Sequence, residues 1–164
     1  MTTSVWEIAN ELVSQLTERG ETVATAESLT GGLVCAHLVD VPGASSAVRG
    51  GIVAYDTRIK ASLLGVSEAL LEDRGAVDPD VAESMGAGVR ERMGSTYGLA
   101  TTGVAGPEPQ DGKPVGTVYV AVVGPEGSRV RGLALDGDRV EIRRRSVEAV
   151  LELLGETLAA EAEG

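Results

Sequence analysis

A short stretch near the N-terminus combines a carboxylate, two hydroxyls and two glycines: Glu27, Ser28, Thr30, Gly31 and Gly32. A serine hydroxyl attacks a carbonyl carbon once a base removes its proton. Glycines have no Cβ, so backbone N–H groups beside them can approach a ligand closely. Such groups bind phosphates or a developing oxyanion. From this stretch alone, a simple helix cap by Ser28 or Thr30 is the favoured interpretation, because most Ser and Thr residues at such turns are caps. A site with Ser28 as nucleophile is the alternative.

The base that would activate Ser28 must be found elsewhere in the chain. His37 is the only histidine, and it falls well inside the helix predicted after Ser28, so its ring should point away. A Ser-Lys pair is the remaining hydrolytic arrangement. Lys60 and Lys113 are the only lysines, and a lysine acts as a base only when its pKa is lowered, for example by burial. Lys60 is the candidate base, with an ordinary solvated helix lysine as the alternative.

Polar side chains follow three predicted strands at their carboxyl ends. Ser28 follows the first strand, Tyr55 and Lys60 follow the second, and Thr102 follows the third. Open α/β sheets bind ligands at the edge where the carboxyl ends of parallel strands meet. If these strands are parallel, the four side chains converge at one edge of the sheet.

Metal and cofactor motifs are absent from the sequence. It has no His-x-x-x-His or Cys-x-x-Cys spacing, no P-loop and no Gly-x-Gly-x-x-Gly motif. We therefore expect no transition metal and no cofactor, although a magnesium site made only of carboxylates stays open. Cys35 lies in an apolar run and is expected to pack in the core.

One basic cluster occurs near the C-terminus, made of Arg139, Arg143, Arg144 and Arg145. It can form a solvated helix face that pairs with nearby glutamates. Arg139, at the start of the predicted helix, can alternatively reach an anionic substrate.

The composition is that of a globular protein. Of the 164 residues, 43% are hydrophobic, but there is no Phe and only one Trp, so Val, Leu, Ile and Ala must build the core. The net charge of −11 argues against nucleic-acid binding. A single cysteine fits a reducing compartment. With no apolar run of membrane-spanning length and no signal peptide, we expect a cytoplasmic protein without membrane contact.

The alternation of patterns predicts strands and helices in turn. Helices are expected at 5–19, 30–39, 57–64, 67–74, 79–93 and 139–160, and strands at 21–25, 48–55, 97–102, 117–123 and 128–135, the last two forming a hairpin. Gly86 and Gly88 inside one helix indicate close packing. This order favours an α/β fold, a three-layer α/β/α sandwich with a mixed, mostly parallel sheet, as a single domain over residues 1–164.

Several motifs occur together in one order and make the chain closely resemble the CinA C-terminal domain family, the nicotinamide-mononucleotide deamidases. The match runs from about Ser4 to Leu158. The motifs are Thr25-Ala26-Glu27-Ser28-x-Thr30-Gly31-Gly32, Gly50-Gly51-x-Val53-x-Tyr55, Lys60 with Leu63-Leu64-Gly65-Val66, Gly75-Ala76-Val77, Thr102-Gly103-Val104-Ala105-Gly106-Pro107 and Lys113-Pro114-Val115-Gly116-Thr117-Val118.

This resemblance implies hydrolysis of the carboxamide of nicotinamide mononucleotide to nicotinate mononucleotide and ammonia, without a metal. It implies a Ser28 nucleophile and a neutral Lys60 base hydrogen-bonded with Tyr55, with Thr102 assisting. Amides near Gly31-Gly32 or Thr102-Gly103 would hold the oxyanion. The expected substrate-binding residues are Glu27, Thr30, Gly31, Gly32, Gly103, Gly106 and Arg139. The expected partner is a small nucleotide, and a homodimer stays open.

The chain also departs from the family pattern. Leu29 stands where many members have Cys, so no chemistry here can depend on that Cys. The 108–112 loop is shorter than in many relatives, which bears on substrate closure. The N-terminal nucleotide-processing domain of many relatives is missing, so we expect a stand-alone form without a second activity. Two alternatives remain: a non-catalytic nucleotide-binding or regulatory module linked to competence or DNA damage, and an amidase for another amide.

Overall fold

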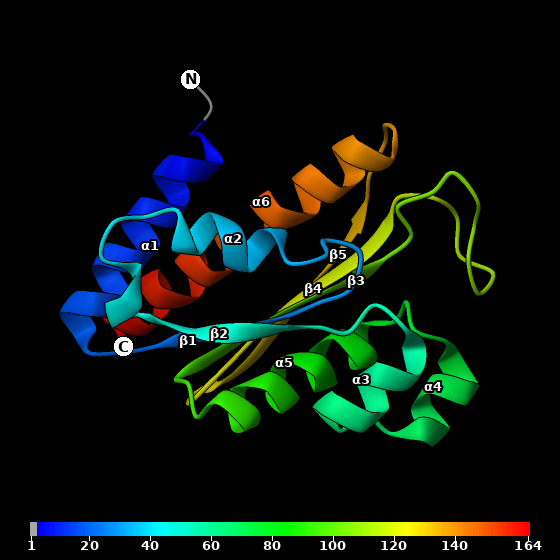
Figure 1. Cartoon of the computed structure of the whole chain (residues 1–164), viewed down its shortest axis with the longest axis horizontal. Helices are drawn as coiled ribbons and strands as arrows, with labels where there is room; N and C mark the ends of the chain where they lie inside the picture. Colours follow the sequence, from blue (N-terminus) through cyan, green and yellow to red (C-terminus); the bar gives the residue numbers. More distant parts are fainter. Residues whose placement is uncertain (1–2) are drawn as a thin grey trace.

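A five-stranded sheet forms the middle layer of the molecule, which the computed structural model describes for residues 3–164 (Figure 1). The strand order is β2-β1-β3-β4-β5. The strands are β1 (Val23–Glu27), β2 (Val48–Val53), β3 (Tyr97–Gly103), β4 (Thr117–Gly124) and β5 (Gly127–Ala134). β1 pairs in parallel with both β2 and β3, and the pairs β3–β4 and β4–β5 are antiparallel. Only β4 therefore runs against the other strands of this sheet, and the prediction of a mixed, mostly parallel sheet is confirmed.

Helices cover both faces of the sheet. The helices α1 (Val5–Arg19), α2 (Leu33–Val39) and α6 (Arg139–Glu163) share one aliphatic core with the first face. The helices α3 (Thr57–Leu64), α4 (Glu68–Arg74) and α5 (Pro79–Met93) share a second core with the other face. A short 3-10 turn, η1 (Ala44–Ser46), precedes β2. This confirms the three-layer α/β/α prediction. No helix within residues 3–164 has both the length and the apolar content to cross a membrane.

Local sequence signals explain most helix boundaries. The Ser4 hydroxyl accepts a hydrogen bond from the Glu7 amide at 3.1 Å at the start of α1, as a capping serine should. Gly20 ends α1 in the left-handed region, at φ +66°. α2, in contrast, begins at Leu33 and not at the predicted Thr30. Gly31 and Gly32 adopt φ values of +58° and +102°, which no right-handed helix contains, so they belong to the preceding turn.

The close packing predicted for α5 is confirmed. A Cβ on Gly88 would collide with the carbonyl oxygen of Leu64, at the end of α3. A Cβ on Gly86 would lie 2.9 Å from Val123 on β4. The two glycines therefore let α5 lie directly against the sheet and against α3, the helix that carries Lys60.

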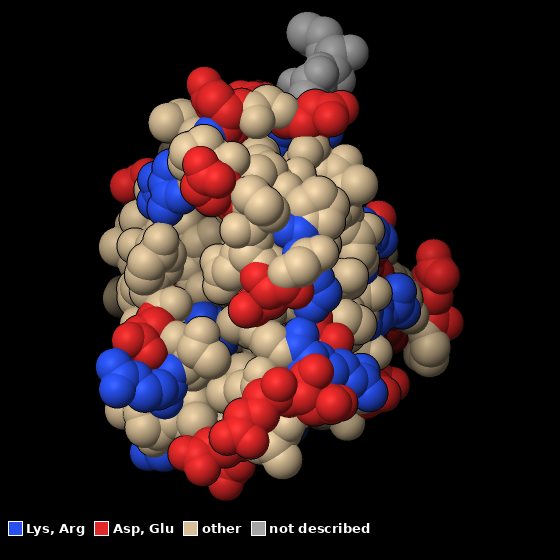
Figure 2. All heavy atoms as spheres, turned by 90° about the vertical axis from the view of Figure 1, so that its right-hand side faces the viewer, with Lys and Arg blue, Asp and Glu red and all other residues tan. Residues whose placement is uncertain are grey.

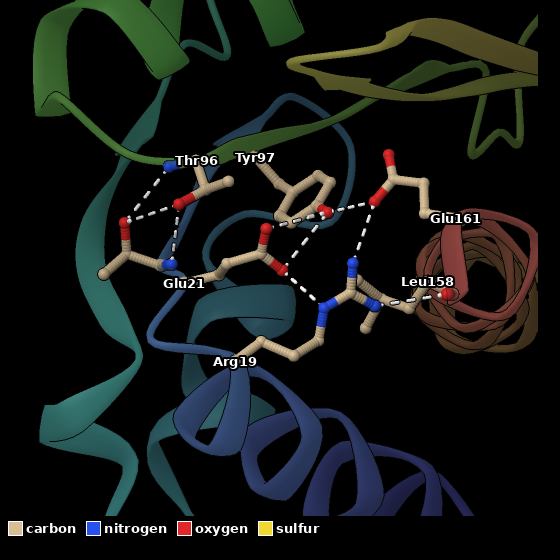
Figure 3. A network of polar contacts seen from close by, with 7 residues as sticks. Arg19, Glu21, Thr96, Tyr97, Leu158 and Glu161 are labelled. Atoms are coloured by element: carbon tan, nitrogen blue, oxygen red, sulfur yellow. Dashed lines mark hydrogen bonds and ion pairs between the residues drawn. The ribbon is translucent and has the colours of Figure 1, made fainter. Parts of the chain in front are cut away.

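The edge of the sheet at the carboxyl ends of β1, β2 and β3 is on the face seen in Figure 2, where basic and acidic side chains lie next to each other in the centre and along the lower part of the view. A partly buried polar network lies at the opposite edge of the sheet (Figure 3). There Tyr97 donates a hydrogen bond to Glu161, and its hydroxyl lies 3.4 Å from Glu21. Arg19 pairs with Glu21 at 2.7 Å and with Glu161 at 3.2 Å. Burial, with a further contribution from Glu161, raises the pKa of Tyr97, so the phenol keeps its proton and acts as a donor. This network joins the end of α6 to α1 and β3.

Tyr97→Phe should lower the free energy of unfolding by about 2 kcal/mol, because it removes a partly buried hydrogen bond to a charged group and keeps the ring. Tyr119→Phe is the matched control, since among the described residues the Tyr119 hydroxyl has no hydrogen-bond partner. Urea unfolding of the two variants measures the difference. Equal stabilities would show that the network does not stabilise the fold.

Candidate active site

A pocket of about 720 Å³ opens at the carboxyl ends of the first three strands. Its walls come from the turns after β1, β2 and β3, the start of α3, the connection between α4 and α5, the segment 104–110 and the start of α6. The predicted residues among its lining are Ser28, Tyr55, Thr102, Gly103, Gly106 and Arg139. Segments far apart in the sequence thus meet at the edge that the strand order indicates.

Ser28 is the first residue after β1 and lies at the inner end of the pocket, only 7% exposed. Its amide donates a hydrogen bond to the Thr101 carbonyl at 3.0 Å, which continues the pairing of β1 with β3 beyond the strand. Its hydroxyl oxygen lies 3.0 Å from Lys60 Nζ. The backbone of Ser28 is thus fixed by the sheet while its hydroxyl meets a buried amine.

Lys60 reaches Ser28 from α3. Asp56 caps this helix by accepting from the Arg58 amide at 2.8 Å, and Gly65 ends it in the left-handed region. Lys60 and Leu64 lie one turn apart on the buried face, so the helix directs the amine inward, where it is 1% exposed. Nζ also lies 2.7 Å from the Ala54 carbonyl and 3.3 Å from the Tyr55 carbonyl. The solvated-lysine alternative is therefore wrong.

Burial lowers the pKa of Lys60 from its ordinary value of 10.5 to about 8, although the Asp56 carboxylate acts in the opposite direction. A neutral amine has two N–H groups and one lone pair. As an ammonium, Nζ donates to Ser28 Oγ and to the carbonyls of Ala54 and Tyr55. Once the amine is neutral, these two carbonyls can accept its two N–H groups, which leaves the lone pair for the Ser28 hydroxyl. This geometry suits an amine that takes the proton of Ser28.

Glu27 lies on the other side of the Ser28 turn, 1% exposed and away from the pocket. Its carboxylate accepts hydrogen bonds from two hydroxyls and three amides. These donors are Thr25 Oγ1 (3.2 Å), Thr30 Oγ1 (2.6 Å), Gly32 N (3.1 Å), Val34 N (2.9 Å) and Cys35 N (3.0 Å). The carboxylate therefore caps α2 and ties that helix to the residues around Ser28.

This arrangement corrects four predicted substrate contacts. Glu27 and Thr30 are buried against each other and do not line the pocket. The Gly32 amide is bonded to Glu27, and the Gly31 amide donates to the Ser28 carbonyl at 3.1 Å. Since those N–H groups already have partners, the expectation that Gly31 and Gly32 hold an oxyanion is wrong. Glycine is required there by the positive φ values and not by a ligand.

Tyr55 and Arg139 form the rim of the pocket. Arg139 donates one hydrogen bond to the Tyr55 hydroxyl at 3.1 Å and another to the Gly106 carbonyl. The expected bond between Lys60 and the Tyr55 side chain is absent among the described residues, because the phenol points toward solvent and Arg139. Only the backbone carbonyl of Tyr55 reaches Lys60. A guanidinium has five N–H donors, so Arg139 keeps donors free for a ligand.

Thr102 and Gly103 lie on the floor of the pocket at the end of β3. The Thr102 hydroxyl donates to the Ala76 carbonyl at 2.8 Å, which ties β3 to the connection between α4 and α5. Gly103 packs so closely on Val118 that a Cβ would lie 2.7 Å from its side chain. The hydroxyl proton of Thr102 is thus engaged within the protein.

The segment 106–113 borders the pocket and is held by two side chains whose contacts were not predicted from the sequence. Lys113 donates to the carbonyls of Arg74 (2.9 Å) and Val77 (2.8 Å), and Asp111 accepts from the Ala76 amide at 3.3 Å. The scarcity of lysine and the Gly75-Ala76-Val77 motif were the available signals for this anchoring. The loop is therefore held over the pocket by the chain around Ala76.

Other candidate groups lie outside the pocket. His37 and Cys35 are both on α2 and do not line it, and burial raises the pKa of the Cys35 thiol. Within residues 3–164, no group of three or more His, Cys, Asp or Glu side chains is arranged to hold a metal ion.

Comparison with known proteins gives consistent matches. The model of the CinA C-terminal domain matches residues 6–158. A CinA-like protein of Frankia casuarinae is 56% identical over 144 residues, which is 88% of this chain and 33% of that protein. A putative competence-damage inducible protein of Desulforamulus reducens is 47% identical over 84% of this chain and 34% of its own length. The chain thus spans about a third of the length of these curated relatives.

Solved structures match over nearly the whole chain. A competence/damage inducible protein from Agrobacterium tumefaciens has a TM-score of 0.90 and 34% identity, covering 97% of this chain and 99% of that one. A competence-damaged protein (CinA) superfamily protein from Enterobacter cloacae has a TM-score of 0.93 and 29% identity, covering 96% and 94%.

Proposed function

Because this chain belongs to the family of the CinA C-terminal domain, we propose that it is an amidohydrolase that converts nicotinamide mononucleotide to nicotinate mononucleotide and ammonia. The observation that carries the proposal is the 3.0 Å contact between the hydroxyl of Ser28 and the buried amine of Lys60 at the end of a pocket. The choice of nicotinamide mononucleotide rests on the family resemblance. The pocket supports a small anionic substrate through its volume and through Arg139.

The first half of the reaction forms an ester with Ser28. Neutral Lys60 takes the hydroxyl proton while Ser28 Oγ attacks the amide carbon, giving a tetrahedral intermediate. The C–N bond then breaks as the Lys60 ammonium returns the proton to the leaving nitrogen, and ammonia departs. Lys60 is again neutral, which prepares it for the second half of the reaction.

The second half restores the enzyme. Lys60 takes a proton from a water molecule that attacks the ester carbon, and the bond to Ser28 Oγ breaks as that oxygen takes the proton back from Lys60. The products are a carboxylate and one released proton. The carbonyls of Ala54 and Tyr55 hold the amine throughout, so the same lone pair serves both halves.

In the proposed complex, the substrate phosphate binds at the rim of the pocket. Arg139 is held there by Gly106 and Tyr55 and retains free donors. Arg58, at the start of α3, also lines the pocket with an exposed side chain, which lies 3.5 Å from the Asp56 carboxylate. A phosphate bound between them places the nicotinamide ring and its carboxamide toward Ser28.

The pH dependence should report Lys60. Only the neutral amine accepts a proton, so kcat/KM should rise with pH and level off above a midpoint near 8, instead of near the ordinary lysine value of 10.5. Asp56→Asn retains a capping side chain but removes the charge that raises the Lys60 pKa, so this variant should shift the midpoint to lower pH. A midpoint at the ordinary lysine value, or one that moves upward in Asp56→Asn, would rule out Lys60 as the titrating base.

Release of ammonia from nicotinamide mononucleotide by the purified protein tests the proposal directly. Ammonia and nicotinate mononucleotide should appear in equal amounts. Binding of the nucleotide without ammonia release would favour the regulatory alternative that the relatives' competence and damage names suggest. Ammonia release from other carboxamides, but not from nicotinamide mononucleotide, would support an amidase activity and show that the proposed substrate is wrong.

A further inference from the structure

The Leu29 amide is a backbone donor that the fold leaves without a protein partner. Leu29 directly follows Ser28 and lines the pocket, yet its side chain packs into the core between the sheet and α6. Among the described residues, no carbonyl, carboxylate or hydroxyl accepts a hydrogen bond from this amide.

The direction of this N–H group is set by its neighbour in the turn. The Gly31 amide donates to the Ser28 carbonyl at 3.1 Å, so that carbonyl points into the turn. A trans peptide is planar, and its N–H points opposite to its C=O. The N–H of Leu29, in the same peptide unit, therefore points out of the turn.

Arg143, from α6, holds the next peptide of the same turn. Its Nε donates to the Leu29 carbonyl at 2.8 Å, and one terminal nitrogen lies 3.4 Å from the Thr30 carbonyl. Arg143 is half-buried and does not line the pocket. The turn is thus held by two side chains. Glu27 accepts hydrogen bonds from amides at the start of α2, and Arg143 of α6 donates to the carbonyls of Leu29 and Thr30.

Several other amides near the nucleophile are engaged, and the Thr30 amide, which also has no partner among the described residues, lies one residue farther along the chain from Ser28. The Ser28 amide donates to Thr101, the Gly32 amide to Glu27 and the Val104 amide to Thr117. The amide directly after a nucleophile lies beside the carbonyl oxygen of the group that the nucleophile attacks. Leu29 is therefore the donor placed best to meet developing charge on that oxygen.

We propose that the Leu29 amide stabilises the oxyanion of the tetrahedral intermediate, and that Arg143 is the residue that positions it. This inference rests on the proposed function, because it takes Ser28 as the nucleophile. Arg143 acts through the backbone and does not touch the substrate. Its removal should therefore lower kcat and leave KM and the Lys60 pH midpoint unchanged.

The test uses a fluorophosphonate probe, which reports Ser28 independently of the natural substrate. Ser28 Oγ forms a bond to phosphorus, the P–F bond breaks, fluoride leaves, and Lys60 takes the hydroxyl proton. The phosphoryl oxygen carries the developing charge. Labelling rates would be measured by intact mass for wild type, Arg143→Met, Arg143→Lys and Arg144→Met. Arg144 is the matched control because it is the next arginine on α6 and, within residues 3–164, pairs only with Glu141 and Glu148.

Arg143→Met should label at least about 10-fold more slowly, since small misplacements of reacting groups are costly. Arg143→Lys keeps one donor for the Leu29 carbonyl and should be intermediate, and Arg144→Met should match wild type. The pH midpoint of labelling should be the same in all four proteins. Equal rates for Arg143→Met and wild type, with both folded, would overturn the role of Arg143.

A backbone substitution tests the amide itself. Cys35 is the only cysteine, so a synthetic segment 1–34 can be ligated to residues 35–164 at that position. Replacing Leu29 by its α-hydroxy acid exchanges the N–H for an ester oxygen and keeps the side chain. Labelling should fall by about 10²-fold relative to the ligated chain with the normal amide, the cost typical of a lost oxyanion donor. An unchanged rate would overturn the inference and leave the proposed function standing. If the wild-type protein is not labelled at Ser28 at all, the nucleophile assignment itself fails.

Discussion

Ser28→Ala should lower kcat by about 10⁴-fold or more, the scale seen when an activated serine nucleophile is removed. Of the groups in the described part of the chain that contact the Lys60 amine, the Ser28 hydroxyl alone can form the acyl bond, since the others are backbone carbonyls. Nucleotide binding should persist, because Arg139 and the rest of the rim do not depend on Ser28. Ammonia release and equilibrium binding, measured on the same preparation, separate these two effects.

Ser95→Ala is the matched control for that variant. Ser95 is also 7% exposed, and it lies before β3 at the opposite edge of the sheet, where its hydroxyl donates to the Tyr97 carbonyl. Both variants should remain folded, and only Ser28→Ala should lose turnover. Near-normal turnover in Ser28→Ala would show that Ser28 is not the nucleophile and serves only as a turn residue.

Lys60→Arg should lose about 10³-fold in kcat/KM or more, although it keeps a positive charge. Arginine does not deprotonate in proteins, so it offers no lone pair to Ser28. General base catalysis is worth about 10²- to 10⁴-fold, which sets the scale of the loss. Substantial activity in a folded Lys60→Arg protein would instead make Lys60 an electrostatic partner of the oxyanion or phosphate.

The larger guanidinium must fit where Lys60 is almost fully buried, so a rescue experiment guards against a misfolded variant. Cys35→Ala removes the only native cysteine, and Lys60→Cys in that background provides a single thiol. Alkylation with ethyleneimine converts this thiol to an amine of nearly lysine length. Activity should be lost in the cysteine variant and recovered after alkylation. Recovery shows that the amine, and not the packing of the site, was missing.

The order of the layers and the proximity of Ser28 to Lys60 were predictable from the sequence. Both residues follow strands that run in parallel, so they lie at the same edge of the sheet. Polar residues after parallel strands collect at one edge whatever the details of packing. The start of α2 was misplaced because Thr30 reads as a helix start, while positive φ angles at Gly31 and Gly32 cannot be seen in a sequence. The tight packing of α5 followed from Gly86 and Gly88, since glycine inside a helix needs a reason.

The roles of Glu27 and Tyr55 were not predictable at the level of atoms. A carboxylate beside a nucleophile suggests a ligand contact, but here five donors of the same domain satisfy Glu27. Tyr55 was expected to meet Lys60 through its hydroxyl, and the structure uses its carbonyl. Which atom of a residue faces a site depends on the local turn, and Arg143 reaches this turn from 113 residues away in the chain.

The central claim is that Ser28 forms an acyl-enzyme with Lys60 as its base. The most direct measurement is mass spectrometry of peptides after acid quenching of a reaction with nicotinamide mononucleotide, on the millisecond timescale. The expected result is an adduct with the mass of the acyl group on the peptide that contains Ser28, absent in Ser28→Ala. Full turnover with no adduct on this peptide at any time, or an adduct on another residue, would contradict it.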